Sequence, residues 1–128
     1  MTNENAACTL KFEDREGYLY ACLSLAEADL QTVRKLWAGI AAECRARGYK
    51  KVLIEQDIQK RLSVMDLFQF ASELPAVGSG LVGAVVDRRP EDHAHLAFGE
   101  AVAVNRGAFG RVFKTVQEAE AWLLSPLT

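Results

Sequence analysis

The alternation of strand-like and helix-like segments constrains the fold of this 128-residue chain more than any other feature. Residues 9–14 alternate apolar and polar side chains, and the more apolar segment 18–23 follows a turn at Gly17, which predicts an opening β-hairpin. Helical and strand patterns then alternate to the C-terminus. The predicted order is therefore ββαβαβαβα, an α/β fold with a mixed, mostly parallel five-stranded sheet and four helices.

The boundaries of these segments are predicted from helix caps and helix-breaking residues. Ser24 and Glu27 have the spacing of a capping box, which predicts that the first helix begins at Ser24. Gly48 is a suitable residue to end that helix, and Pro75 is expected to end the second one. The other predicted helices are 63–74, 91–105 and 115–123, and the other predicted strands are 52–54, 81–86 and 109–113.

Composition and charge exclude several classes of protein. The formal net charge of −2 gives no electrostatic basis for binding nucleic acid. The longest apolar runs are far shorter than a membrane-spanning helix, and the N-terminal segment is polar and acidic, unlike a signal peptide. We therefore expect a single cytoplasmic domain over residues 1–128, with residues 1–8 as a flexible N-terminus.

The cysteines and histidines do not form a metal-binding pattern. Cys8, Cys22 and Cys44 have neither the spacing of metal ligands nor that of a C-x-x-C motif, and each lies in a predicted apolar segment. His93 and His95 are two residues apart on a predicted helix, whereas chelation on a helix requires a spacing of four. We expect buried thiols, solvent-facing histidines, no metal and no cofactor.

The C-terminal segment suggests a family. A glycine turn, a short strand ending at Phe113 and a capped helix form the segment NRGAFGRVFKTVQEAEAWL. Together with the order of elements, it resembles the SpoIIAA-like group of the STAS (sulfate transporter and anti-sigma-factor antagonist) and Sec14-like superfamily, over about residues 10–124. The resemblance implies a module that is not an enzyme and binds a partner protein. Other relatives are thought to hold a lipid-like ligand between helices and sheet.

Ser63 has two interpretations. The resemblance implies a regulatory phosphorylation site here, because the antagonists carry their switched serine at the start of the second helix. The residues themselves predict a helix cap: Ser63 as N-cap places Asp66 at the third helical position, and Leu62 and Leu67 at the two positions of a hydrophobic staple. A phosphate would also be favoured at this helix end. The antagonists' D-S-S-G-like run is reduced here to the single serine.

Glu55 and Asp57 are the candidate crevice carboxylates. They follow the predicted strand 52–54, and the carboxyl ends of parallel strands are where α/β folds place their ligands. Alternation places both side chains on one face, where they could bind a cation or act as a paired acid and base. The competing interpretation is that they are solvated loop charges.

Several apolar side chains of the second and third helices are candidates for contact with an apolar ligand. Phe68 and Phe70 belong to a broad apolar surface of the second helix, and Phe98 to that of the third. Helical spacing places Asn105 on the same apolar face as Phe98, where its amide requires hydrogen-bond partners. Asn105 either caps carbonyl groups at the helix end or contacts a ligand.

Three functional hypotheses follow. The leading one is a non-enzymatic STAS-like regulatory or protein-interaction module with a protein partner, including a second copy as a homodimer. The alternative is a carrier of a small apolar or lipid-like molecule, which requires a continuous pocket of several hundred Å³ lined by Phe68, Phe70 and Phe98. The weaker alternative is an enzyme that uses Glu55 and Asp57, which requires a cleft joining them to another titratable group.

Overall fold

The computed structural model describes residues 8–126 and confirms the predicted α/β fold. Except for Cys8, which begins the first strand, the predicted flexible N-terminus lies outside the described residues. In chain order the elements are β1 (Cys8–Arg15), β2 (Tyr18–Glu27), α1 (Leu30–Arg47), β3 (Lys51–Lys60), α2 (Val64–Val77), β4 (Val82–Asp87), the short 3₁₀ helix η1 (Pro90–Asp92), α3 (His93–Asn105), β5 (Gly110–Phe113) and α4 (Val116–Leu123).

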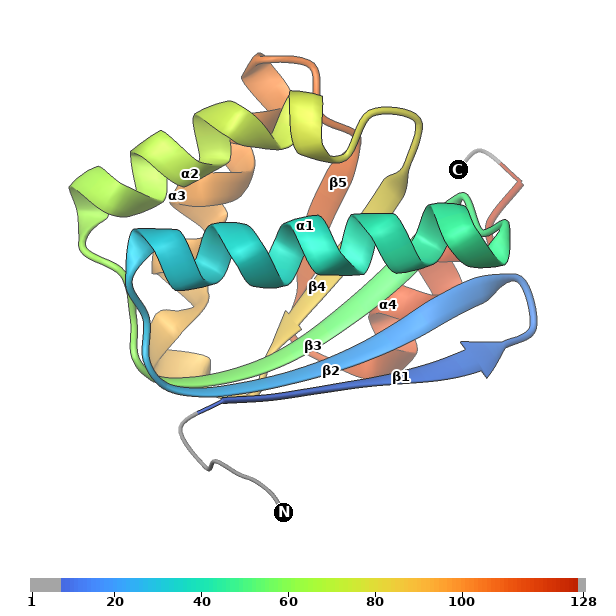
Figure 1. Ribbon diagram of the computed structural model, residues 1–128, viewed down its shortest axis with the longest axis horizontal. Coiled ribbons are helices and arrows are strands. Elements are labelled where there is room, and N and C mark those ends of the chain that lie inside the picture. The colour runs from blue at the N-terminus through green and yellow to red at the C-terminus, as the bar shows by residue number, and fades with distance from the viewer. Residues whose placement is uncertain (1–7, 127–128) are drawn as a thin grey trace.

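The strands lie in the sheet in the same order as in the chain, β1-β2-β3-β4-β5. β1 is antiparallel to β2, and the other neighbouring pairs are parallel. When consecutive parallel strands are neighbours, right-handed crossovers place every connecting helix on the same face. Accordingly, α1, α2 and α3 cover one face of the sheet and α4 covers the other (Figure 1).

The first helix begins later than predicted. β2 continues through Glu27, which pairs with Lys60 of β3, and α1 begins after Asp29, whose side chain accepts a hydrogen bond from the Thr32 backbone N–H at 2.9 Å. The Ser24 capping box was therefore the wrong interpretation. Alternate residues of this segment are buried in the sheet, and that burial keeps the segment in a strand despite its helix-start signature.

The later boundaries agree more closely with the sequence. Ser63 and Thr115 are the N-caps of α2 and α4, as predicted. β5 pairs in parallel with β4, so the predicted strand 109–113 joins the sheet. Pro75, however, lies within the last turn of α2. A proline removes one donor from a helix, and α2 continues for two further residues before it ends.

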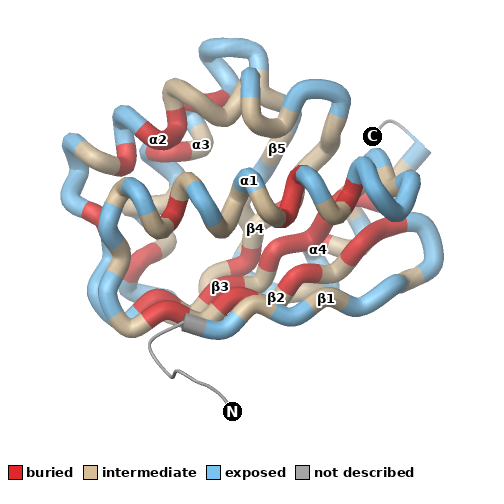
Figure 2. Tube along the Cα trace, viewed as in Figure 1, coloured by how far each residue is buried: buried red, intermediate tan, exposed pale blue. Residues whose placement is uncertain are grey.

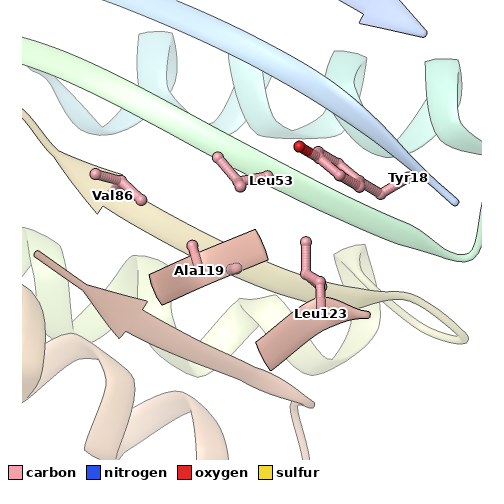
Figure 3. Close-up of a cluster of buried hydrophobic side chains, with 6 residues drawn as sticks. Tyr18, Leu53, Val86, Ala119 and Leu123 are labelled. Carbon is pink, nitrogen blue, oxygen red and sulfur yellow. The ribbon is translucent and has the colours of Figure 1, made fainter. Parts of the chain in front are cut away.

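The face of the sheet beneath α4 has a closely packed core. Tyr18, Leu53, Ala84, Val86, Ala119 and Leu123 form this cluster, and none of them is more than 3% exposed. Figure 3 shows the side chains of Leu123 and Ala119 directed at the strands. The Tyr18 hydroxyl donates a hydrogen bond of 2.6 Å to Glu120 of α4. This face therefore contributes tight packing and a satisfied polar contact.

A carboxylate covers part of the edge strand β5. Val112 pairs with Val85 of β4, while the Val112 backbone N–H donates a hydrogen bond of 2.6 Å to the Glu100 side chain of α3. An edge strand has outward N–H groups that require partners. Glu100 supplies one such partner from within the same chain.

Candidate functional site

A cavity of about 170 Å³ lies between the three-helix layer and the sheet. Gly83 and Val85 of β4 line it, and both are only partly buried although β4 is an internal strand covered on both faces. On the opposite face of the same strand, Ala84 and Val86 are buried. Figure 2 shows intermediate residues along β4 beside the buried middle of β3. The helices therefore leave unfilled space above β4.

Most of the cavity wall is apolar and comes from elements that are far apart in the sequence. Trp37 of α1 and Phe70 of α2 contact each other edge to face, with ring centroids 5.3 Å apart, and hold the two helices together. The apolar lining includes Val33, Trp37, Ile40, Ala41, Val52, Ile54, Ile58, Leu67, Phe70, Ala71, Leu74, Val85, Leu96 and Val112. A largely apolar wall is typical of sites for small molecules.

One end of the cavity is polar, where β3 and β4 approach the start of α3. Gln56 and Asp87 are register partners on these strands, and the Gln56 amide donates a hydrogen bond of 3.2 Å to Asp87. The other Asp87 oxygen accepts a bond of 2.7 Å from the Arg89 backbone. Arg61 donates a bond of 3.0 Å to the buried Asp92, the residue before α3. Both carboxylates thus already have partners.

His95 lines the same end of the cavity and corrects the prediction of a solvent-facing histidine. Burial lowers the pKa of His95 below its usual value and Arg61 lowers it further, while Asp92, Asp87 and a hydrogen bond to the Leu62 backbone act in the opposite direction. The Nε2 atom is buried and has no hydrogen-bond partner within residues 8–126. Because Nε2 has no partner, we assign the bond with the Leu62 backbone to Nδ1.

The burial of Asp87 also changes its acidity. Burial raises the pKa of the Asp87 carboxyl, and the charges of Asp92 and Asp57 raise it further, whereas its hydrogen bonds to Arg89 and Gln56 act in the opposite direction. The polar end thus combines a neutral imidazole with carboxylates whose charge is partly compensated.

Glu55 and Asp57 share one face, as predicted, but it is the face opposite the cavity. β3 continues to Lys60, so both residues lie within a strand and the solvated-loop interpretation was wrong. Glu55 accepts hydrogen bonds from the Tyr20 hydroxyl and from Arg88, the latter at 3.1 Å. Asp57 accepts one of 2.9 Å from Arg89. The two carboxylates therefore form separate ion pairs, each with its own arginine.

Ser63 is a helix cap. Its hydroxyl accepts a hydrogen bond of 3.1 Å from the Asp66 backbone N–H, and its β-region dihedral angles are those of an N-cap. Leu62 and Leu67 are both buried in one cluster, as the predicted staple requires. The Ser63 side chain is exposed, and its phosphorylation stays a prediction.

The predicted ligand-contacting residues divide into two groups. Phe70 is buried and lines the cavity. Phe68 and Phe98 are 41% and 42% exposed, and Asn105 is exposed as well, so the prediction of an inward-facing Asn105 was wrong. α3 is apolar around most of its circumference, and its buried side is formed by Gly99, Val102 and Ala103. Spacing alone could not choose between these two sides.

Sequence reasoning missed the polar end of the cavity, although a signal was present. Gln56 and Asp87 occupy equivalent positions toward the carboxyl ends of neighbouring parallel strands. Strand-end positions of this kind are frequent ligand sites in α/β folds. The contribution of Asp92 and His95 could not be read from spacing, because it depends on how η1 positions the start of α3.

The described residues carry neither a metal-binding cluster nor a membrane-spanning helix. Residues 8–126 hold no group of three or more His, Cys, Asp or Glu side chains arranged for a metal ion. Across the same residues, no helix combines the length and the apolar character needed to cross a membrane.

Comparisons with protein-family models and with curated proteins found no match to this chain.

Proposed function

We propose that this protein binds a small, mainly apolar molecule in the cavity between α1–α3 and the sheet. The observation that carries the proposal is the cavity itself, about 170 Å³ with a largely apolar wall and one polar end. An apolar protein cavity of about 150 Å³ holds one benzene molecule, so a ligand the size of a single substituted ring fits. Binding a ligand here removes apolar surface from water on both partners.

The fold supports a pre-formed site. Trp37 and Phe70 join α1 to α2, and Leu67 of α2 lies against Gly99 of α3, where an added Cβ would be 3.1 Å from the Leu67 side chain. The three helices thus brace one another above the sheet. A braced layer keeps the space open, and a ligand then loses less affinity to reorganisation of the protein.

Titration with toluene and benzyl alcohol tests the proposal, followed by backbone amide chemical shifts in NMR. We expect saturable shifts at residues lining the cavity, such as Ala71 and Val112. The variant Val85→Phe places a ring in the cavity and should abolish these shifts. The matched control Val64→Phe adds the same ring at a position that is exposed and outside the cavity. Absence of binding to the native protein would overturn the proposal.

A second candidate function is protein interaction, as expected of a STAS-like regulatory module. The supporting observation is a set of exposed apolar side chains on neighbouring helices: Val64, Met65 and Phe68 on α2 and Phe98 on α3. The guanidinium of Arg106 lies over the ring of Phe68, 5.1 Å from its centroid, so a charged group borders this exposed apolar set. Sedimentation analysis of the native protein and of Met65→Asp tests for a homodimer, which the charged variant should dissociate.

Membership of the STAS group belongs to this second proposal. The order ββαβαβαβα and the capped α4 support it. A cytoplasmic location and control through Ser63 would follow from that membership. Mass spectrometry of protein purified from its host tests for phosphate on Ser63.

A further inference from the structure

The polar end of the cavity is rich in hydrogen-bond acceptors. Asp87 and Asp92 place two carboxylates there, and the guanidinium of Arg61 pairs with one of them while remaining 48% exposed. A ligand carboxylate or phosphate would therefore face two negative groups and one cation that already has a partner. Like charges at close range disfavour binding, so an anionic ligand fits this end poorly.

Nε2 of His95 is the buried side-chain atom without a hydrogen-bond partner in the part of the chain that the structure describes. Asp87 accepts from Gln56 and from the Arg89 backbone, and Asp92 accepts from Arg61. Burial keeps the pKa of His95 below its usual value, so the imidazole is neutral at pH 7. With Nδ1 donating to the Leu62 backbone, Nε2 carries a lone pair and no partner.

We propose that the cavity takes a small apolar molecule bearing one uncharged hydrogen-bond donor, an alcohol, whose hydroxyl donates to Nε2 of His95. A single hydroxyl matches the one buried side-chain atom of residues 8–126 that lacks a hydrogen-bond partner. An ammonium group would be attracted to the two carboxylates but would lose the hydration of its charge in a mostly apolar space, whereas a carboxylate or ketone has no donor. This inference rests on the proposed function, because it assigns the ligand class of the same cavity.

The ring of His95 must tilt for this contact to form. Nε2 is covered by neighbouring atoms, although His95 as a whole is partly exposed and lines the cavity. The χ2 torsion of histidine has broad energy minima, so a modest tilt about this bond has a small cost. An unpaired buried acceptor gains a hydrogen bond on ligand binding that it lacks beforehand.

A set of four size-matched probes tests the assignment: toluene, benzyl alcohol, benzylamine and benzoate. Dissociation constants are measured by NMR titration of the full chain at pH 7.5. We expect benzyl alcohol to bind about 3- to 10-fold more tightly than toluene, as one net hydrogen bond predicts. Benzoate should bind most weakly of the four. Equal or tighter binding of benzoate or of benzylamine than of benzyl alcohol would overturn the inference.

Two variants separate the contribution of His95 to alcohol binding from that of His93. His95→Leu should remove the advantage of benzyl alcohol over toluene and leave toluene binding. The control His93→Leu changes a histidine on the same helix that does not line the cavity, and it should keep the advantage. The ¹⁵N shift of Nε2 in the native protein is a further measurement that needs no variant. It should move with benzyl alcohol and not with toluene.

The outcomes distinguish this inference from the proposed function. If none of the four probes binds, both fail. If toluene binds in the cavity but benzyl alcohol has no advantage, or if His95→Leu keeps that advantage, the alcohol assignment fails and the proposed function stands.

Discussion

The two faces of β4 are packed to very different degrees. On one face Ala84 and Val86 are buried beneath α4, a helix of eight residues. On the other face Gly83 and Val85 remain partly exposed to a cavity although three longer helices lie above them. The amount of helix over a face therefore does not determine how well that face is packed.

The difference follows from which groups meet at each face. α4 presents the small Ala119 beside Leu123, so the helix can approach the strands closely, and both residues are fully buried. In the three-helix layer, large side chains such as Trp37 and Phe70 are used for contact between helices. Because these contacts hold the helices against one another, the helices do not pack closely against the sheet above β4. We expect stability to come mainly from the α4 face and binding from the other.

The largest expected effect comes from truncating one leucine on each face. Leu123→Ala should lower the free energy of unfolding by about 3–5 kcal/mol, because it leaves a new void in a close-packed core. Leu96→Ala, at a partly exposed cavity position, should cost about 1–2 kcal/mol. Urea denaturation monitored by circular dichroism measures both. Equal losses would mean that the two faces are packed alike.

The next largest change in stability is expected from enlarging two adjacent residues of β4. Val86→Phe should destabilise the protein by about 1–3 kcal/mol, because no space is available beneath α4. Val85→Phe should change the free energy of unfolding by less than about 0.5 kcal/mol, since its ring enters the cavity. Thermal unfolding of the two variants side by side provides the measurement. A large loss for Val85→Phe would contradict the cavity.

Helix caps on the two faces should have similar stability effects but different binding effects. Ser63→Ala and Thr115→Ala should each lower the free energy of unfolding by about 1 kcal/mol, because each removes a side-chain acceptor from a helix N-terminus. Only Ser63→Ala should weaken toluene binding, because α2 forms part of the cavity wall and α4 does not. Denaturant unfolding and NMR titration of both variants check the two statements. Weaker binding by Thr115→Ala would show that the faces are coupled.

The smallest expected effect is the contribution of His95, on the cavity face, to the pH dependence of stability. His95 has an ordinary pKa of 6.5 and a lower one in the folded protein, where Arg61, Asp92 and Asp87 surround it. Between these two pKa values the unfolded state binds more protons. The free energy of unfolding should therefore decline as pH falls below about 6.5, and this decline should be smaller in His95→Leu.

The contribution of Asp87 to the pH dependence of stability must be separated from that of His95. Its pKa is raised in the folded protein, so its own contribution declines as pH rises above the ordinary value of 3.8. Because His95→Leu retains Asp87, the difference between native protein and variant isolates the histidine. A difference that does not change between pH 5 and 7.5 would contradict the assigned pKa direction.

The fold could be predicted because more than one sequence feature indicated the same element. The strand 109–113 was expected from both its own pattern and the capped helix after it, and β5 pairs with β4 as required. The Ser24 boundary was wrong because a local capping signature competed with pairing to β3, 30 or more residues away along the chain. Local signals do not include the energy of that pairing.

The site was less predictable because it depends on an unfilled space. Of the three phenylalanines expected at a cavity, Phe70 lines it, whereas Phe68 and Phe98 do not. No pattern indicated that Val85 would be left partly exposed within an internal strand. Asn105 was placed on the wrong side because α3 offers apolar residues on both sides. Cavities result from how helices meet one another, and a sequence pattern shows only which side chains are available.

The hydrogen bond between Glu100 and Val112 also has a consequence for assembly. β5 has four residues, and the outward N–H of Val112 is already occupied, so an incoming strand would have to displace a carboxylate of the same chain. The opposite edge, β1, is eight residues long and carries Lys11 and Glu13. The β5 edge is therefore short and has one N–H already occupied, whereas the β1 edge is longer and carries charges, so we expect extension by another chain to favour β1.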